Sequence, residues 1–202
     1  EERIAEAVAK GRGVILLSAH VGNWEIAGNL LHDRLGVPIN VLMLDAEREA
    51  LQRIYAPALQ HRRFRVIALD PSTPDAMVET MARLNQGEIV CLLGDRILDG
   101  RQRRVRFLDG EAAFPIGPFA LAALSAAPVI PVFTLKKALR HYAFQAAPPI
   151  TVSGDRRTRE QAIDTGLAAY VATLERVVRE HPYQWYNFYR FWEPANEAPG
   201  AR

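Results

Sequence analysis

The 202-residue sequence contains a single cysteine, Cys91, so no disulfide can form within the chain. Cys91 lies in the apolar run IVCLLG, where we expect a small buried side chain and not a nucleophile. The sequence also lacks a signal peptide and any apolar run of about 18 residues, which a membrane-spanning helix needs. These absences exclude a disulfide scaffold and are compatible with a reducing compartment.

Charge of one sign is not in large excess either, because 25 basic and 23 acidic residues leave a formal net charge of +2. The chain as a whole is therefore not a nucleic-acid binder. Basic residues do gather at 62–65, 101–106 and 136–140. Such clusters can attract phosphates, acidic carrier proteins or anionic lipid, and they can equally be solvated faces.

Several familiar motifs are missing. Neither a GxGxxG run nor a GxxxxGK[ST] run follows an expected strand, so a nucleotide-binding function lacks support. The five histidines show no HExxH or paired spacing, and no cysteine cluster accompanies them. We therefore expect no metal and no redox cofactor.

Hydrophobic residues make up 49% of the chain, which is enough for a sizeable core. Short apolar runs alternate with helical segments, and this order predicts an α/β fold with a central, mostly parallel mixed sheet flanked by helices. The expected strands are 13–19, 37–44, 65–69, 88–94, 105–108, 127–135 and 141–147, the last as an antiparallel neighbour. The expected helices are 1–10, 23–35, 46–62, 75–86, 115–126 and 158–180.

We expect one domain over residues 1–194, followed by a disordered tail at 195–202. The sequence opens with Glu1 in the middle of a helical pattern, so we expect it to be a fragment of a longer chain. Ligands of open α/β sheets bind beyond the carboxyl ends of the strands. That rule directs attention to His20, Asp45, Asp70 and Asp95, each of which follows an expected strand.

The run HVGNWE begins at His20, directly after the first strand. Gly22 allows an unusual backbone and Asn23 suits a helix N-cap, which places Glu25 in the first helical turn. Because the chain turns between them, Glu25 can approach His20. A carboxylate that fixes a histidine tautomer is the unit of general-base catalysis. A structural histidine bonded to a local backbone group is the alternative that spacing alone leaves open.

Four further segments accompany this run in a fixed order. They are residues 87–96 (GEIVCLLGDR), 106–110 with Phe114-Pro115, 127–132 (APVIPV) and 180–185 (EHPYQW). Together with HVGNWE they resemble the lysophospholipid acyltransferase superfamily, and specifically the late acyltransferases of bacterial lipid A biosynthesis. The resemblance covers about residues 5–193.

The resemblance implies a glycerolipid acyltransferase-like fold and an O-acyltransferase working peripherally at the cytoplasmic face of a bacterial inner membrane. An acyl carrier protein or coenzyme A thioester would donate the fatty acyl chain, and a lipid or glycolipid hydroxyl would accept it. His20 would be the general base and Glu25 its orienting partner. No cofactor beyond the donor thioester is implied.

Three departures leave the acceptor lipid open. The family usually has Asp-Gln where this chain has Asp95-Arg96, and the ending differs around Tyr186–Phe191. The resemblance also implies an N-terminal membrane-anchoring region upstream of residue 1, which is not part of this sequence. Two other functions also stay open. The same pair could act on water as a thioester hydrolase, or the chain could be a non-catalytic module that binds lipid or carrier protein.

Further substrate-binding candidates come from polar residues near the expected site. Arg96 can bind a phosphate or polarise the thioester carbonyl. Arg104 and Arg106 can also contact phosphate, and Arg48, which follows the second strand, can face the same cleft. Asn23 and Asp95 complete the predicted binding set. The small residues of 117–127 can line an acyl groove or serve close helix packing. We expect the aromatic tail at 184–192 to cap the core, with a membrane-interface role as the alternative.

Overall fold

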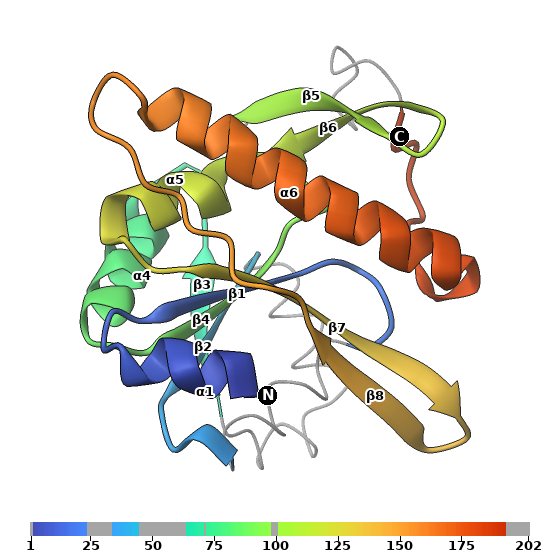
Figure 1. Cartoon of the computed structure of the whole chain (residues 1–202), viewed down its shortest axis with the longest axis horizontal. Helices are drawn as coiled ribbons and strands as arrows, with labels where there is room; N and C mark the ends of the chain where they lie inside the picture. Colours follow the sequence, from blue (N-terminus) through green and yellow to red (C-terminus); the bar gives the residue numbers. More distant parts are fainter. Residues whose placement is uncertain (1, 24–33, 45–63, 71, 98–100, 193–202) are drawn as a thin grey trace.

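The central feature of the computed structural model, which describes residues 2–23, 34–44, 64–70, 72–97 and 101–192, is a six-stranded sheet (Figure 1). Its strand order is β3-β2-β4-β1-β7-β8. The first five strands run parallel and β8 pairs antiparallel with β7, which confirms the predicted α/β class. The strands are β1 (Val14–Ser18), β2 (Ile39–Leu44), β3 (Arg65–Leu69), β4 (Ile89–Leu93), β7 (Val129–Ala138) and β8 (His141–Ala146).

Strand β1 lies in the middle of the sheet and is buried along its whole length. Successive side chains of a strand point to opposite faces, so a continuous apolar run suits a strand covered on both sides. Ile15 and Leu17 pack into the core cluster that includes residues of three helices. Val14 and Leu16 pack on the other face.

The helices divide between the two faces. Helix α1 (Glu2–Ala9) contributes Ile4 and Ala7 to the cluster on one face. Helices α4 (Asp75–Asn85), α5 (Gly117–Ser125) and α6 (Arg159–Glu180) cover the other face, where Tyr170 of α6 is fully buried. The expected helices at 23–35 and 46–62 fall largely or wholly outside the described residues.

A second, two-stranded sheet consists of β5 (Gln102–Phe107) and β6 (Gly110–Pro115), which pair antiparallel beside α6 (Figure 1). The sequence predicts only a short strand at 105–108 after a charged loop, and this prediction is wrong about the hairpin. Arg103 and Arg104 fall in the predicted loop, but both lie on β5, and Arg103 forms ion pairs with Glu160 and Asp164 of α6 at 2.6 and 3.0 Å. Phe107 meanwhile packs its ring 5.3 Å from that of Phe114.

The chain after α6 runs along the carboxyl edge of the sheet. A short 3₁₀ turn, η1 (Pro182–Gln184), places Gln184 against the β7 backbone, where its side chain accepts from the Lys136 N–H and donates to the Lys136 carbonyl. The expectation that the aromatic tail caps the core holds for part of it. Phe191 is buried, whereas Tyr186 and Phe188 are 45% and 87% exposed.

Gly22 packs closely against the backbone of β7 at this edge. Its φ of +68° is left-handed, and a Cβ there would lie 2.0 Å from the Thr134 carbonyl oxygen of β7. Gly11 has a similar φ of +72° with no atom within 4 Å of the corresponding position. The two glycines therefore share a backbone conformation and differ in the space around them.

We expect Gly11→Ala to lower the free energy of unfolding by about 1–2 kcal/mol, the cost of a left-handed residue with a side chain. Gly22→Ala should cost about 1–3 kcal/mol more, because the added methyl group overpacks against backbone. Urea denaturation of both variants measures the difference. Equal losses would contradict the close approach of Gly22 to β7.

Candidate active site

His20 lies two residues beyond the end of β1, at the carboxyl edge of the sheet. The backbone around it is held on two sides. The Tyr186 N–H donates to the His20 carbonyl at 2.7 Å, and the Gly22 N–H donates to the Gln184 carbonyl at 2.8 Å. The Asn23 N–H donates to the Thr134 carbonyl at 2.8 Å, which ties the run HVGN to β7. His20 is thus fixed between β7 and the segment that follows α6.

Asp95 lies two residues beyond the end of β4, the parallel neighbour of β1. Ser18 is in register with Leu93, so His20 and Asp95 occupy matching positions past the two strand ends. The Gly94 N–H donates to the Ser18 carbonyl at 2.8 Å and keeps the two chains together beyond the ladder. A Cβ at Gly94 would lie 2.8 Å from the Tyr170 hydroxyl, so the close packing of Tyr170 against Gly94 depends on glycine.

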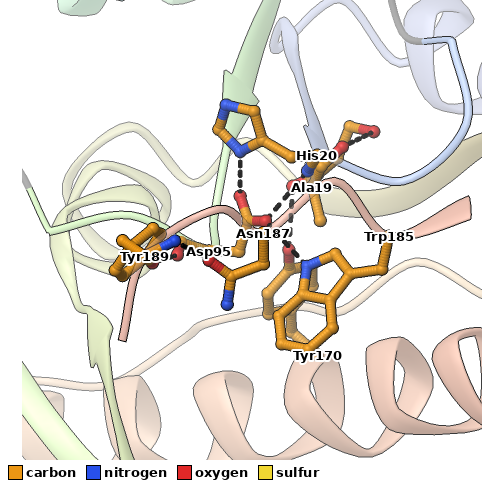
Figure 2. Close-up of polar contacts among 8 residues, drawn as sticks. Ala19, His20, Asp95, Tyr170, Trp185, Asn187 and Tyr189 are labelled. Carbon is orange, nitrogen blue, oxygen red and sulfur yellow. Dashed lines mark hydrogen bonds and ion pairs between the residues drawn. The ribbon is translucent and has the colours of Figure 1, made fainter. Parts of the chain in front are cut away.

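The Asp95 carboxylate holds His20 through both of its oxygens. Oδ1 lies 2.8 Å from the His20 Nδ1, and Oδ2 accepts the His20 backbone N–H at 2.9 Å (Figure 2). An ionised carboxylate can only accept, so Nδ1 carries the proton in this contact. Nε2 then keeps its lone pair. The Asp95 side chain is 3% exposed and that of His20 is 17% exposed, so the carboxylate is shielded while the imidazole reaches solvent.

Two aromatic residues from the C-terminal segment complete the surroundings of Asp95. The Trp185 indole Nε1 donates to Asp95 Oδ2 at 3.2 Å, and the Tyr189 hydroxyl donates to the Asp95 carbonyl at 2.6 Å (Figure 2). The Tyr170 hydroxyl of α6 donates to the Ser18 carbonyl at 2.8 Å. These donors lie about 90 to 150 residues away from their acceptors in the chain, so only the fold brings them together.

Both phenols keep their protons. Burial raises the pKa of Tyr170 well above its ordinary value, and the negative charge of Asp95 raises it further. Burial also raises the pKa of Tyr189, Asp95 adds to that rise, and the positive charge of Arg96 lowers it again in part. Each hydroxyl is therefore a lasting hydrogen-bond donor that holds the strand ends in place.

A cavity of about 450 Å³ opens next to Asp95 and lies within the size range of small-molecule sites. It is formed at the carboxyl ends of β2, β3 and β4 together with α4 and α5. Most of its wall is apolar, and Arg96, the residue after Asp95, belongs to that wall. The lining residues are Leu42, Leu69, Asp70, Ser72, Thr73, Pro74, Met77, Leu92, Leu93, Arg96, Arg101, Pro115, Gly117, Pro118 and Leu121.

Arg96 stands between this cavity and the aromatic segment, with its guanidinium carbon 5.7 Å from the centre of the Tyr189 ring. Arg104 and Arg106 lie on β5 with exposed side chains, and Arg104 is 3.8 Å from Glu111 on β6. Neither contributes to the cavity wall. Asn23 contacts β7 through its backbone, and Arg48 lies outside the described residues.

Glu25 also lies outside the described residues, so its role as an orienting partner stays a prediction. The sequence predicts Glu25 as the carboxylate partner of the His20 ring, and among the described residues Asp95 contacts that ring at Nδ1. The sequence placed Asp95 at the correct edge of the sheet but as a substrate-binding residue. Trp185 and Tyr189 were missed as partners of Asp95, because nothing local in the aromatic tail distinguishes them from core residues.

Burial raises the pKa of the Cys91 thiol to about 12, so this cysteine carries no thiolate near neutral pH. Within the described ranges, no three His, Cys, Asp or Glu side chains are grouped closely enough to hold a metal ion. None of the helices described is long and apolar enough to cross a membrane.

Comparison with known proteins agrees with this geometry. Residues 1–193 match the sequence model of the bacterial lipid A biosynthesis acyltransferases. The chain is also similar to the phosphatidylinositol mannoside acyltransferase of two Mycobacterium tuberculosis strains, CDC 1551 / Oshkosh and ATCC 25618 / H37Rv, at 28% identity over 195 residues. The protein of the same name from Mycolicibacterium smegmatis is 26% identical over 192 residues.

These alignments cover 95% of the chain and 58–60% of the relatives' own length, so the chain spans less than two thirds of each relative. The family match, in contrast, extends over nearly the whole sequence. With a histidine–carboxylate pair at the sheet edge and an apolar cavity beside it, the chain belongs to the bacterial lipid A biosynthesis acyltransferase family.

Proposed function

We propose that this protein transfers a fatty acyl chain from a thioester to a hydroxyl of a membrane glycolipid, with His20 as the general base. The observation that carries the proposal is the contact between His20 Nδ1 and the buried Asp95 carboxylate, which leaves the Nε2 lone pair available to accept a proton. The named activities of the relatives favour a lipid with a sugar headgroup as the acceptor.

The reaction follows from these positions. His20 Nε2 takes the proton of the acceptor hydroxyl as its oxygen attacks the thioester carbonyl carbon, and Asp95 stabilises the imidazolium that forms. The guanidinium of Arg96, which follows Asp95 in the chain and lines the cavity, stabilises the developing oxyanion. The carbon–sulfur bond then breaks, the ester is complete, and the imidazolium returns its proton to the departing thiolate. No acyl-enzyme is required.

The cavity beside Arg96 suits the acyl chain of the donor. Its apolar wall includes Gly117, Pro118 and Leu121 of α5, within the stretch of small residues that the sequence analysis considered as an acyl groove. Burying each methylene group there contributes about 0.8 kcal/mol. The acyl carrier, either an acyl carrier protein or coenzyme A, and an inner-membrane location remain predictions from the family resemblance.

Hydrolysis by the same pair is the competing function, and a product assay separates the two. Thioester consumption should depend on an added lipid alcohol, and the acylated lipid should account for the thiol released. Equal thioester consumption with and without the alcohol, with free fatty acid as the product, would identify a hydrolase.

Replacing the pair tests the base directly. His20→Ala should lower the acyl-transfer rate by roughly 10²–10⁴-fold, the usual contribution of a positioned base. Asp95→Asn should lower the acyl-transfer rate by a factor in the same range, because an amide does not fix the imidazole as a carboxylate does. Rates are measured by single-turnover transfer from a radiolabelled thioester, with circular dichroism to confirm folding.

Asp109→Asn provides the matched control, since the Asp109 side chain is 97% exposed at the β5–β6 turn. It should transfer at the wild-type rate. Transfer by folded His20→Ala within a factor of about five of wild type would rule out His20 as the base.

Narrowing the cavity tests where the acyl chain lies. Leu121→Trp should slow transfer of a 16-carbon chain relative to a 12-carbon chain by on the order of 100-fold, because four methylene groups lose about 0.8 kcal/mol each. Leu124→Trp, on the same helix but 58% exposed, is the control and should leave the ratio unchanged. An unchanged ratio in Leu121→Trp would show that the acyl chain binds elsewhere.

A further inference from the structure

The tip of the β7–β8 hairpin exposes a basic and apolar surface next to the candidate active site. Lys136, Lys137, Leu139 and Arg140 are all exposed, and Leu139 is 85% exposed at the turn. Figure 1 shows the hairpin projecting away from the body of the molecule. Tyr183, 96% exposed, joins these residues through its neighbour Gln184. We call these five residues the hairpin surface.

The charge of the hairpin surface is of one sign. Between Glu111 and Asp155 the sequence contains no acidic residue at all, so the three basic side chains have no acidic neighbour in their own part of the chain. Basic residues close to an anionic bilayer each contribute about 1 kcal/mol to binding. An ordinary solvated loop needs neither this uniform charge nor a fully exposed leucine at its tip.

Hydrogen bonds connect the hairpin surface to the catalytic pair. The Gln184 side chain grips the backbone of Lys136 through two bonds, of 2.8 and 3.0 Å. The next residue, Trp185, donates to Asp95, and the Tyr186 N–H donates to the His20 carbonyl. A partner bound to the hairpin surface therefore lies close to the sheet edge that holds His20.

We propose that the hairpin surface docks onto an anionic lipid bilayer and so presents the His20 edge to lipid at the membrane surface. The proposal rests on the proposed function only in that a membrane glycolipid is the acceptor. An acidic carrier protein would match the basic residues equally well. The exposed Leu139 and Tyr183 favour a bilayer, because an apolar side chain and a tyrosine ring are stabilised at the membrane interface.

Vesicle co-sedimentation of the purified protein tests the surface without using activity. Lys136→Gln/Lys137→Gln should weaken binding to vesicles of phosphatidylcholine with 30% phosphatidylglycerol by about 30-fold, from about 1 kcal/mol per charge. Arg156→Gln/Arg157→Gln removes two charges from exposed positions just before α6 and should bind as wild type. Leu139→Ser should weaken binding by about tenfold or more, since the bilayer no longer buries a leucine side chain at this position.

The outcomes separate the surface from the proposed function. Unchanged vesicle binding in both the lysine and the Leu139 variants would overturn the proposal, whatever their transfer activity. Weaker binding to an acidic acyl carrier protein, with unchanged vesicle binding, would identify a carrier site and also overturn it. His20→Ala should bind vesicles as wild type does, so a failure of the acyl-transfer mechanism would leave the vesicle result intact.

Discussion

The carboxylate of Asp95 is the point on which the rest of the site depends. A buried carboxylate is costly unless its oxygens accept hydrogen bonds. The two Asp95 oxygens accept hydrogen bonds from three donors, namely the His20 Nδ1–H, the His20 backbone N–H and the Trp185 indole N–H. These donors come from the end of β1 and from the chain after α6, so a single charged group ties both to β4.

The parallel sheet makes this arrangement possible. Because β1 and β4 are neighbours in register, the residues two positions past their ends face each other without any special loop. The Tyr170 hydroxyl donates a hydrogen bond to the Ser18 carbonyl and so holds the end of β1. Gly94 has no side chain and leaves room for that hydroxyl. The site is therefore held by the backbone of the sheet and by buried donors, which suits a base that must keep one orientation through the reaction.

Much of the frame could be predicted from the sequence, because a short apolar run marks a strand such as β4, and Pro74 and Gly87 mark the two ends of helix α4. The carboxyl-edge rule also located His20 and Asp95. Their pairing could not be predicted, since it depends on β4 and not β2 lying next to β1. Local spacing favoured Glu25 instead. The β5–β6 hairpin was missed for a related reason, because Arg103 is satisfied by acidic residues of a distant helix.

The central claim is that Asp95 holds the His20 ring with the proton on Nδ1 and the lone pair on Nε2. Long-range ¹H–¹⁵N NMR of the imidazole, in protein labelled on histidine and assigned with His20→Ala, reads the tautomer directly at a pH where the ring is neutral. The account predicts a protonated Nδ1 and an unprotonated Nε2 in the wild type, and loss of that fixed tautomer in Asp95→Asn. A His20 ring protonated on Nε2 in the wild type would contradict it.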